Sequence, residues 1–292
     1  MQEFTHCLIC NNFDLSPLNN YQKCYLVKCN SCKFVFAKRI PTYEELVAEY
    51  SSAYTRNDHI SPITLKRYEE IFKHLNKFKV NNNILDVGAG NGHFLQAAKR
   101  NGWNAYGTEF EQRAIDRCVS KGITMHLGKL NPENYRPEMF DIITSFEVIE
   151  HINNPIEEIK NFNALLRKGG LVYLTTPNFN SISHTLLREK WTIFNYPEHL
   201  SYYTPSTLKK LFESAGFKKK LIKTTGIGIT RLKDSAGIKT NKESVFSTET
   251  IRNKTEGKSI GALAKRGINF ILTTTKKGDK IKAEFIKINK EN

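Results

Sequence analysis

The sequence contains no apolar run that approaches the roughly 18 residues needed to cross a membrane. Its first residues, Met-Gln-Glu-Phe-Thr-His-Cys, also lack the basic start and apolar core of a secretory signal. We therefore expect a cytoplasmic protein without a membrane span. Hydrophobic residues still make up 39% of the 292 residues, and aromatic residues make up 11%. This apolar content excludes a disordered chain and predicts one large folded domain or two smaller ones.

Acidic residues are scarce in the last third of the chain. The whole sequence has 44 Lys and Arg against 29 Asp and Glu, a net charge of +15. Residues 201–292 hold 21 basic and 8 acidic residues, so 21 − 8 = +13 of this charge lies there. Such an excess could attract phosphate, nucleic acid or an anionic membrane surface. The lysines alternate with Thr, Asn and Ile without forming a compact basic tract, so a solvated surface explains them equally well.

Cysteine is almost absent after residue 32, because five of the six cysteines lie at or before that position. In a reducing compartment, metal binding or burial is a more common role for cysteine than a disulfide. Four of them form two Cys-x2-Cys pairs separated by 18 residues: Cys7, Cys10, Cys29 and Cys32. Two such pairs can place four thiolates around one tetrahedral Zn²⁺ and leave no position for a reactive water. The β-prone residues around the second pair complete the prediction of a structural zinc-ribbon subdomain over residues 1–48.

The two other cysteines and one nearby histidine are weaker ligand candidates. Cys24 and His6 belong to no pair with two-residue spacing, so we rank both below the four paired cysteines. Cys118 lies in a helical pattern and is interpreted as a small core residue.

A glycine-rich turn follows a short apolar segment near residue 84. The sequence Ile84-Leu-Asp-Val-Gly-Ala-Gly-Asn-Gly92 predicts a buried strand and a turn, and the next residues predict a helix that ends at Gly102. Glycines allow the backbone to approach a ligand closely, and the helix N-terminus offers N–H groups to it. Glu109 ends the next predicted strand, where its carboxylate could accept both hydroxyls of a ribose. The pattern therefore predicts a cofactor that contains a nucleoside.

Dinucleotides and S-adenosylmethionine (SAM) are both bound by sites of this plan. The glycines here follow Gly-x-Gly-x-Gly, whereas dinucleotide folds normally show Gly-x-Gly-x-x-Gly. Asp86 lies two residues before the first glycine, at the predicted carboxyl end of the strand. A carboxylate there would repel a pyrophosphate and attract the ammonium and sulfonium groups of SAM. The sequence therefore favours SAM over NAD.

These residues and three later segments resemble the successive motifs of class I SAM-dependent methyltransferases. The later segments cover residues 140–147, 148–151 and 166–177. The resemblance extends from about residue 50 to residue 217, and it implies a seven-stranded, mainly parallel, Rossmann-like α/β sheet. The SAM-binding domain would cover residues 49–225, and the basic segment 226–292 would complete the sheet and could add a lid. The implied cofactor-binding residues are Asp86, Gly88, Gly90, Gly92, Glu109, Phe110, Leu130, Phe146 and Glu147.

Helical spacing supports strands that alternate with helices. The residues expected on helix faces toward the core are Phe110, Ala114, Ile115, Cys118 and Val119, then Ile156, Ile159, Phe162, Leu165 and Leu166, and, before the sheet, Tyr68, Ile71, Phe72 and Leu75. Tyr50 and Tyr54 are expected to enter near the cofactor. A mainly parallel sheet would place the ligand at the carboxyl ends of its strands.

A long aromatic segment between residues 178 and 203 is the predicted acceptor loop. His199 is the first candidate for a general base, because imidazole can take up a proton near neutral pH. Tyr196 could assist or orient it, and His151 is a second candidate base. The Tyr-Pro-Glu-His segment and the cysteine pairs resemble the deoxysugar C-methyltransferases and their relatives in surface-polysaccharide synthesis. In the members of that group that methylate sugar carbon atoms, a Tyr-x-x-His pair serves deprotonation beside a ketone, which would assign those roles to Tyr196 and His199.

The predicted function is methyl transfer from SAM to a small polar acceptor, such as a nucleotide sugar. Members of the deoxysugar group have a further carboxy-terminal domain, and the sequence up to Asn292 does not contain a match to it. Both O-methylation and C-methylation are therefore kept as possible reactions. An O-methyltransferase for a quinone or an RNA is the alternative enzyme, and a basic surface beside the cofactor would favour RNA. A zinc-ribbon interaction protein with an inert SAM fold is the non-enzyme alternative, and an NAD oxidoreductase ranks last.

Overall fold

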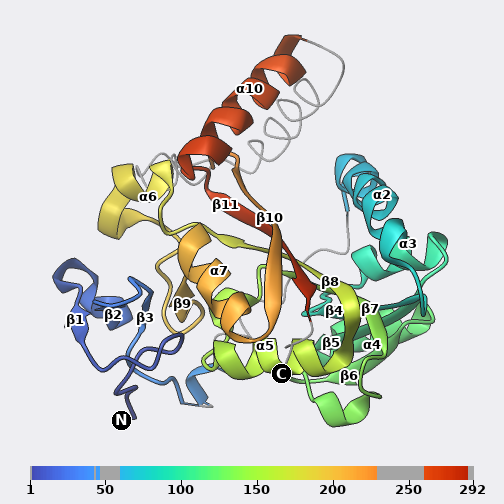
Figure 1. The fold of residues 1–292 in the computed structure, drawn as a ribbon, viewed down its shortest axis with the longest axis horizontal. Coiled ribbons are helices and arrows are strands. Elements are labelled where there is room, and N and C mark those ends of the chain that lie inside the picture. The colour runs from blue at the N-terminus through green and yellow to red at the C-terminus, as the bar shows by residue number, and fades with distance from the viewer. Residues whose placement is uncertain (1, 43, 47–59, 229–259, 289–292) are drawn as a thin grey trace. The chain divides into compact units, whose positions relative to one another are not determined.

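The structure is a computed structural model that describes residues 2–42, 44–46, 60–228 and 260–288, with the backbone alone for residues 260–266 (Figure 1). The chain forms two compact units. Unit one contains Met1–Ile40, Thr176–Leu208 and Ile222–Lys282, and unit two contains Pro41–Thr175, Lys209–Leu221 and Ala283–Asn292. The domain boundaries expected near residues 48 and 225 stay predictions. Tyr50, Tyr54 and residues 229–259 of the segment 226–292, in which a lid was expected, lie outside the described residues.

A seven-stranded sheet has the strand order β10-β11-β8-β7-β4-β5-β6. Its strands are β4 (Asn83–Val87), β5 (Asn104–Glu109), β6 (Thr124–Leu127), β7 (Phe140–Phe146), β8 (Leu166–Pro177), β10 (Phe217–Thr225) and β11 (Lys280–Lys287). β4 to β8 pair in parallel. The order reverses between β4 and its neighbours β7 and β5, and such a reversal opens a crevice for a ligand at the strands' carboxyl ends. The expected seven-stranded, Rossmann-like sheet is therefore confirmed.

Four helices of unit two connect or cover these strands: α2 (Pro62–Leu75), α3 (His93–Arg100), α4 (Gln112–Ser120) and α5 (Pro155–Leu165). Short 3-10 turns add η2 (Asn76–Phe78), η3 (Pro132–Asn134) and η4 (Ile149–His151), and α7 (Pro205–Ser214) precedes β10. Side chains cap these helices where the sequence offers an acceptor. Asn154 accepts the N–H of Glu157 at the start of α5, and Glu111 accepts the N–H of Ala114 at the start of α4.

Three expectations about helix faces are wrong. Phe110 is 56% exposed, since it precedes the first turn of α4, and Val119 is 54% exposed on that helix. Leu166 does not end a helix, because α5 stops at Leu165 and Leu166 begins β8. The other expected residues of α4, Ala114, Ile115 and Cys118, are buried.

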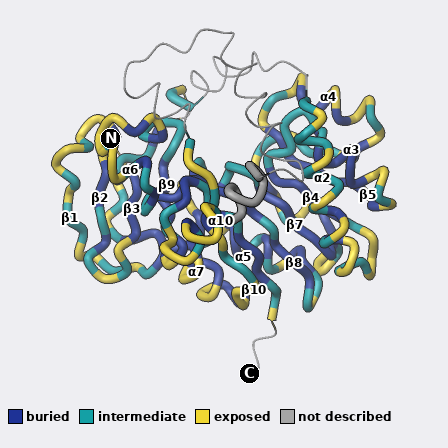
Figure 2. Tube along the Cα trace, turned by 90° about the horizontal axis from the view of Figure 1, so that it is seen from above, coloured by how far each residue is buried: buried dark blue, intermediate teal, exposed yellow. Residues whose placement is uncertain are grey.

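The core of unit two lies between the sheet and helices α2 and α3. Phe94 stacks on Phe72 with ring centroids 4.8 Å apart, and Phe146 meets Phe94 edge-on at 4.8 Å. Figure 2 shows the central strands of this sheet mostly in the colour of buried residues. Helix α2 joins this core through the expected residues, of which Phe72 and Leu75 are buried and Tyr68 and Ile71 are partly buried. Burial of β4 and β7 on both faces explains their near-continuous apolar sequences.

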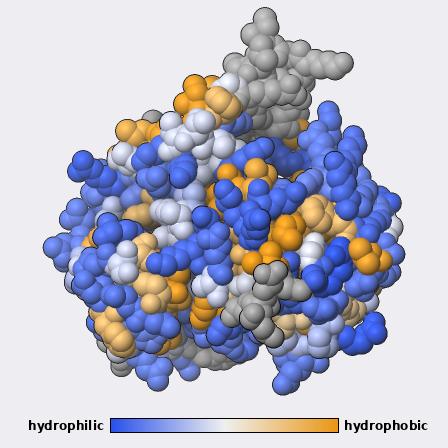
Figure 3. Space-filling model, in the orientation of Figure 1, coloured by the Kyte–Doolittle hydropathy of each residue, from blue (hydrophilic) through white to orange (hydrophobic). Residues whose placement is uncertain are grey.

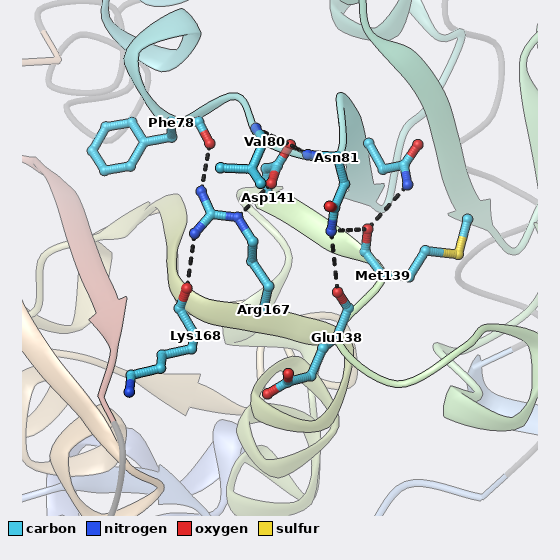
Figure 4. A network of polar contacts seen from close by, with 9 residues as sticks. Phe78, Val80, Asn81, Glu138, Met139, Asp141, Arg167 and Lys168 are labelled. Carbon is cyan, nitrogen blue, oxygen red and sulfur yellow. Dashed lines mark hydrogen bonds and ion pairs between the residues drawn. The ribbon is translucent and has the colours of Figure 1, made fainter.

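A buried ion pair joins two strands at the end of the sheet where the parallel strands begin (Figure 4). Asp141 at the start of β7 is 0% exposed, and it accepts N–H bonds from Val80 at 3.0 Å and Asn81 at 2.8 Å. Arg167 in β8 donates to the same carboxylate and also to the carbonyl of Phe78 at 2.6 Å. A buried charge is tolerated when its lone pairs are filled in this way. This network joins the chain ahead of β4 to strands β7 and β8.

A four-stranded sheet with the order β1-β2-β3-β9 belongs to unit one. Its strands are β1 (Leu15–Pro17), β2 (Leu26–Cys29), β3 (Val35–Ala37) and β9 (Ser201–Tyr202). The pairs β1–β2, β2–β3 and β3–β9 are all antiparallel. Unit one also contains η1 (Asn19–Cys24), α6 (Ile182–Leu187), η5 (Arg188–Lys190) and α10 (Ile260–Thr275). Because β9 lies in the expected acceptor loop, that loop shares a sheet with the amino-terminal cysteine segment.

Within the part of the chain that the structure describes, no helix has the length and apolar character needed to cross a bilayer. The longest of these helices, α10, has 16 residues.

Candidate functional site

The glycine-rich turn after β4 has the backbone that its sequence predicts. Gly88, Gly90 and Gly92 have positive φ angles of 74°, 52° and 72°. A Cβ atom at Gly88 would lie 2.4 Å from a methyl of Val148, and one at Gly92 would lie 2.6 Å from the sulfur of Cys118. A Cβ at Gly90 would meet no described atom within 4 Å. Gly88 and Gly92 are therefore required for packing, whereas the space above Gly90 can receive a ligand that touches the backbone.

The carboxylate of Glu109 is fixed by the backbone at the end of β5. Its Oε2 accepts the N–H of Gly90 at 2.8 Å, and its Oε1 accepts the N–H of Phe110 at 2.7 Å. The residue is 6% exposed. Each carboxylate oxygen thus accepts one backbone N–H, and Glu109 joins the glycine turn to the end of β5.

Asp86 is buried in β4, with 2% of its surface exposed. Burial raises the pKa of its carboxyl to about 8; the Thr144 hydroxyl, which donates to Oδ1 at 2.6 Å, lowers it, and the charge of Glu109 raises it further. The raised pKa favours the neutral carboxyl, and a cation beside it would favour the charged form. The attraction that the sequence predicted between Asp86 and SAM is therefore an attraction to the charged form of Asp86.

The other expected cofactor residues of unit two lie at or beyond the ends of strands. Phe146 ends β7, and its ring lies 5.7 Å from that of Tyr173. Glu147 follows with a left-handed backbone, φ 56°, and donates its N–H to the carbonyl of Thr175 at 2.9 Å. Such a backbone at a non-glycine residue carries strain, which is common near functional sites. Leu130 is 2% exposed, so its side chain is buried, in contrast to that of Phe110.

His151 also belongs to unit two. It ends the 3-10 turn η4, where its N–H donates to the carbonyl of Val148 at 2.9 Å. The glycine turn, Glu109, Phe146, Glu147 and His151 all follow the carboxyl ends of parallel strands of this sheet. The site residues that were expected in unit two are thus gathered at the edge where a ligand binds in this class of fold.

Tyr196 and His199 lie in unit one, in the segment before β9. The ring Nδ1 of His199 is 2.6 Å from the carbonyl oxygen of Ile193. Because a carbonyl oxygen can only accept, Nδ1 carries the hydrogen in the neutral ring and Nε2 carries the lone pair. The backbone N–H of His199 donates to the carbonyl of Asn195 at 2.6 Å. The imidazole is therefore held in the tautomer that can accept a proton at Nε2.

The sequence interpretation missed a cluster around Tyr196. The Tyr25 ring lies 5.0 Å from the Tyr196 ring, and the Arg39 guanidinium lies 5.4 Å from the centre of the Tyr196 ring. Arg39 also donates to the hydroxyl of Tyr25 at 3.2 Å. A guanidinium against an aromatic face is attracted by the ring electrons. No short-range pattern could reveal this cluster, because Tyr25 and Arg39 come from the amino-terminal segment.

Most aromatic residues of the expected acceptor loop form a core. Trp191, Ile193, Leu200 and Tyr202 pack with residues of β2 and β3 in one buried cluster. The Ala37 N–H also donates to the carbonyl of Leu200 at 2.8 Å. The aromatic content of this segment is therefore explained first by packing on the amino-terminal sheet. The same packing holds the backbone that presents Tyr196 and His199.

The four paired cysteines form two turns with the same backbone pattern. The residue after each pair, Asn11 or Lys33, has a positive φ and donates its N–H to the carbonyl of the first cysteine of the pair at 3.0 or 2.9 Å. The sulfur atoms of Cys7 and Cys32 are 3.4 Å apart, and those of Cys10 and Cys29 are 3.6 Å apart. All four sulfurs lie within 4.8 Å of one another.

A tetrahedral Zn²⁺ with bonds of about 2.3 Å would separate its sulfur ligands by about 3.8 Å. The observed cluster is close to this size, so the four cysteines fit one such ion. Cys24 and His6 are not members of the cluster. Cys24 is buried in the neighbouring apolar cluster of unit one.

Comparison with known proteins agrees with this geometry. Residues 65–221, more than half of the chain, match the family model described as a methyltransferase domain. A ubiquinone biosynthesis O-methyltransferase from Coxiella burnetii strain RSA 331 is 28% identical over 191 residues, which are 60% of this chain and 77% of the relative. The enzyme with this name from Nitrosomonas europaea is 25% identical over 170 residues, covering 54% of this chain and 71% of the relative.

Among solved structures, phosphoethanolamine N-methyltransferase 2 from Haemonchus contortus in complex with SAM has the same fold. It superimposes with a TM-score of 0.55 at 16% identity, covering 87% of this chain and 62% of that one. The glycine turn at the switch point of the sheet, the anchored Glu109 and the family match lead to one conclusion. This chain belongs to the methyltransferase domain family and is a class I SAM-dependent methyltransferase.

Proposed function

We propose that this methyltransferase transfers the methyl group of SAM to a hydroxyl of a small acceptor. The observation that carries the proposal is the geometry of His199, whose Nδ1 donates to the Ile193 carbonyl and leaves the lone pair on Nε2. A hydroxyl is a poor nucleophile until its proton is removed, and a neutral imidazole can take that proton near neutral pH. We assign His199 as the base and Tyr196 as the residue that orients the acceptor. His151 is the second candidate base.

The proposed cofactor contacts follow from the residues at the strand ends. Glu109 would accept the two ribose hydroxyls, and the turn that Gly88 and Gly92 shape would offer close backbone contact at Gly90. Exposed Phe110 and the segment at Leu130 would flank the adenine, while Asp86 and the backbone at Phe146 and Glu147 would face the methionine part. When bound, SAM supplies an electrophilic methyl group on a positively charged sulfur.

Methyl transfer to a hydroxyl needs no reactant other than SAM and the acceptor. His199 Nε2 would take the hydroxyl proton from the acceptor oxygen, and SAM would supply the methyl group to that oxygen and keep the electron pair of its carbon–sulfur bond on sulfur. The protein's part is to align oxygen, carbon and sulfur and to receive the proton.

A phenolic hydroxyl of a quinone precursor is the acceptor class that we favour. The two curated relatives are named for O-methylation in ubiquinone biosynthesis, and each matches more than two thirds of its length to this chain. The sugar alternative rests on the Tyr-Pro-Glu-His segment at residues 196–199 and on the cysteine pairs. A phenol ionises more readily than a sugar hydroxyl, so a neutral imidazole is a more effective base for it.

The acceptor class can be tested with SAM labelled in its methyl group. We expect label to enter a catechol carrying a short prenyl chain at least about tenfold faster than it enters nucleotide sugars at equal concentration. Mass spectrometry of the product distinguishes methyl on oxygen from methyl on carbon. Faster labelling of a nucleotide sugar would overturn the phenolic assignment, and product methylated on carbon would overturn O-methylation.

We further propose that Cys7, Cys10, Cys29 and Cys32 hold one structural Zn²⁺. The proposal is supported by the matched turns and by sulfur separations close to those of a tetrahedral site. Four thiolates would fill the coordination shell, so the ion would stabilise the β1–β3 segment without taking part in methyl transfer.

Elemental analysis of the purified protein should find about one zinc per chain. Replacing Cys10 by Ser should reduce the zinc content at least severalfold and lower the melting temperature, because binding of a structural metal stabilises the folded state. Cys24→Ser is the matched control, since Cys24 is in the same segment but outside the sulfur cluster, and its zinc content should stay near one. Folded wild-type protein that contains no zinc would contradict the assignment.

A further inference from the structure

In the part of helix α10 whose side chains the structure describes, residues 267–275, the hydrogen bonds to β10 and the turn after it come from one side of the helix. Leu272 on that side is 3% exposed, and its carbonyl accepts the Thr224 hydroxyl at 2.5 Å. Asn269 accepts the N–H of Gly226 at 2.9 Å, and the Thr273 hydroxyl donates to the carbonyl of Thr224 at 2.9 Å. These attached residues are spaced three and four positions apart, which places them on one face of the helix.

Large apolar side chains lie on the rest of the helix. Ile268 is 52% exposed, Phe270 is 71% exposed and Ile271 is 60% exposed. Three such residues within four consecutive positions form a cluster, whereas single exposed apolar side chains are ordinary. Figure 3 shows apolar surface in the upper part of the view, where Figure 1 draws α10 in the same orientation. We refer to Ile268, Phe270 and Ile271 as the apolar face of α10.

The sequence around this face is strongly basic. Between residues 265 and 282 there are six Lys and Arg residues: Lys265, Arg266, Lys276, Lys277, Lys280 and Lys282. The only acidic residue in the interval is Asp279, which is 4% exposed and accepts hydrogen bonds from Ser183 and Gly228, both at 2.6 Å. The interval therefore has a net charge of 6 − 1 = +5, its one carboxylate is buried, and basic residues precede and follow the apolar face in the sequence.

We propose that the apolar face of α10 and its basic flanks bind the surface of an anionic lipid bilayer. Apolar side chains of a surface helix can enter the boundary between headgroups and acyl chains, and neighbouring Lys and Arg residues are attracted to anionic lipids. A nucleic acid would use the basic residues but has no need for the apolar cluster. A second copy of this chain would carry the same positive charge and would be repelled. The charge and the apolar face together therefore favour an anionic membrane, and this inference does not depend on the proposed acceptor.

Vesicle flotation with the full-length protein tests this inference. We expect binding to vesicles of equal phosphatidylglycerol and phosphatidylcholine to be at least about tenfold stronger than binding to pure phosphatidylcholine. Raising the salt from about 0.1 M to about 0.5 M should weaken that binding severalfold, because salt screens the attraction to the anionic surface. Equal binding to both kinds of vesicle, or binding to neither, would overturn the proposal.

A double variant separates the apolar face from the general positive charge. Phe270→Ser with Ile271→Ser should weaken vesicle binding at least about tenfold without loss of folding, because both side chains are mostly exposed. The control Val119→Ser removes a 54% exposed apolar residue from α4 and should bind vesicles as the wild type does. Unchanged binding of the double variant would overturn the proposal. Light scattering without lipid adds an independent check, since a wild-type dimer that the double variant converts to a monomer would show that this face joins two chains instead.

Discussion

Replacing His199 by Asn should lower the turnover number by about 10²- to 10⁴-fold, the usual contribution of a general base. The Asn amide can still donate to the Ile193 carbonyl, which His199 now contacts through Nδ1 at 2.6 Å. The variant therefore retains the local hydrogen bond and loses the basic nitrogen at the position of Nε2. Steady-state kinetics with a methylated acceptor, together with calorimetric titration of SAM, measure the effect. The SAM affinity should stay within about twofold of the wild type, because the expected cofactor residues do not include His199.

His184→Asn provides a matched control for this substitution. The Nδ1 of His184 lies 2.5 Å from the carbonyl oxygen of Phe179, which is the same kind of contact that His199 makes in the same unit. An Asn amide can keep this hydrogen bond at either position. His184 packs between Phe179, Trp191 and Phe194, and its replacement should lower the melting temperature more than the turnover number. If His199→Asn retained turnover within a few fold, the base would have to be sought elsewhere, first at His151.

Replacing Glu109 by Gln should weaken SAM binding by about two orders of magnitude. A hydrogen bond to a charged group contributes about 1.5–3 kcal/mol, so loss of a charged acceptor for two ribose hydroxyls corresponds to about 3 kcal/mol. The amide also cannot accept both the Gly90 and the Phe110 N–H groups through its two ends, as the carboxylate does. Calorimetric titration with SAM measures the change in dissociation constant.

Glu111→Gln is the control for the loss of one negative charge near the turn. Glu111 caps α4 by accepting the N–H of Ala114 at 2.6 Å, so the neutral amide oxygen can preserve its contact. We expect this variant to bind SAM within about twofold of the wild type. A Glu109→Gln protein that binds SAM as tightly as the wild type would remove Glu109 from the cofactor site while leaving the family assignment intact.

Local sequence determined the parts of the fold that depend on neighbouring residues. The apolar strand from residue 84, the glycine turn and the acid at the end of β5 all lie within about 26 residues, and each has a short-range physical requirement. The two Cys-x2-Cys turns are local in the same sense, because each closes through backbone bonds within one short segment. The helical spacing of apolar residues misplaced Phe110, Val119 and Leu166. Such spacing marks the apolar side of a helix, but it does not show where the helix begins or ends, or which of its residues the rest of the protein covers.

Only the tertiary structure decided what the aromatic segment before β9 does. The sequence marks it as long and aromatic, which predicts a functional loop, yet Trp191 and Tyr202 are core residues against the amino-terminal sheet. The contact of Arg39 with Tyr196 and the pairing of Val35 with Tyr202 join residues that are far apart along the chain. The sequence by itself therefore determined the cofactor turn and the cysteine cluster, whose geometry is set by backbone rules over a few residues. The environments of Tyr196, His199 and the apolar face of α10 depend on which distant surfaces are covered by packing, and a pattern of neighbouring residues does not contain that information.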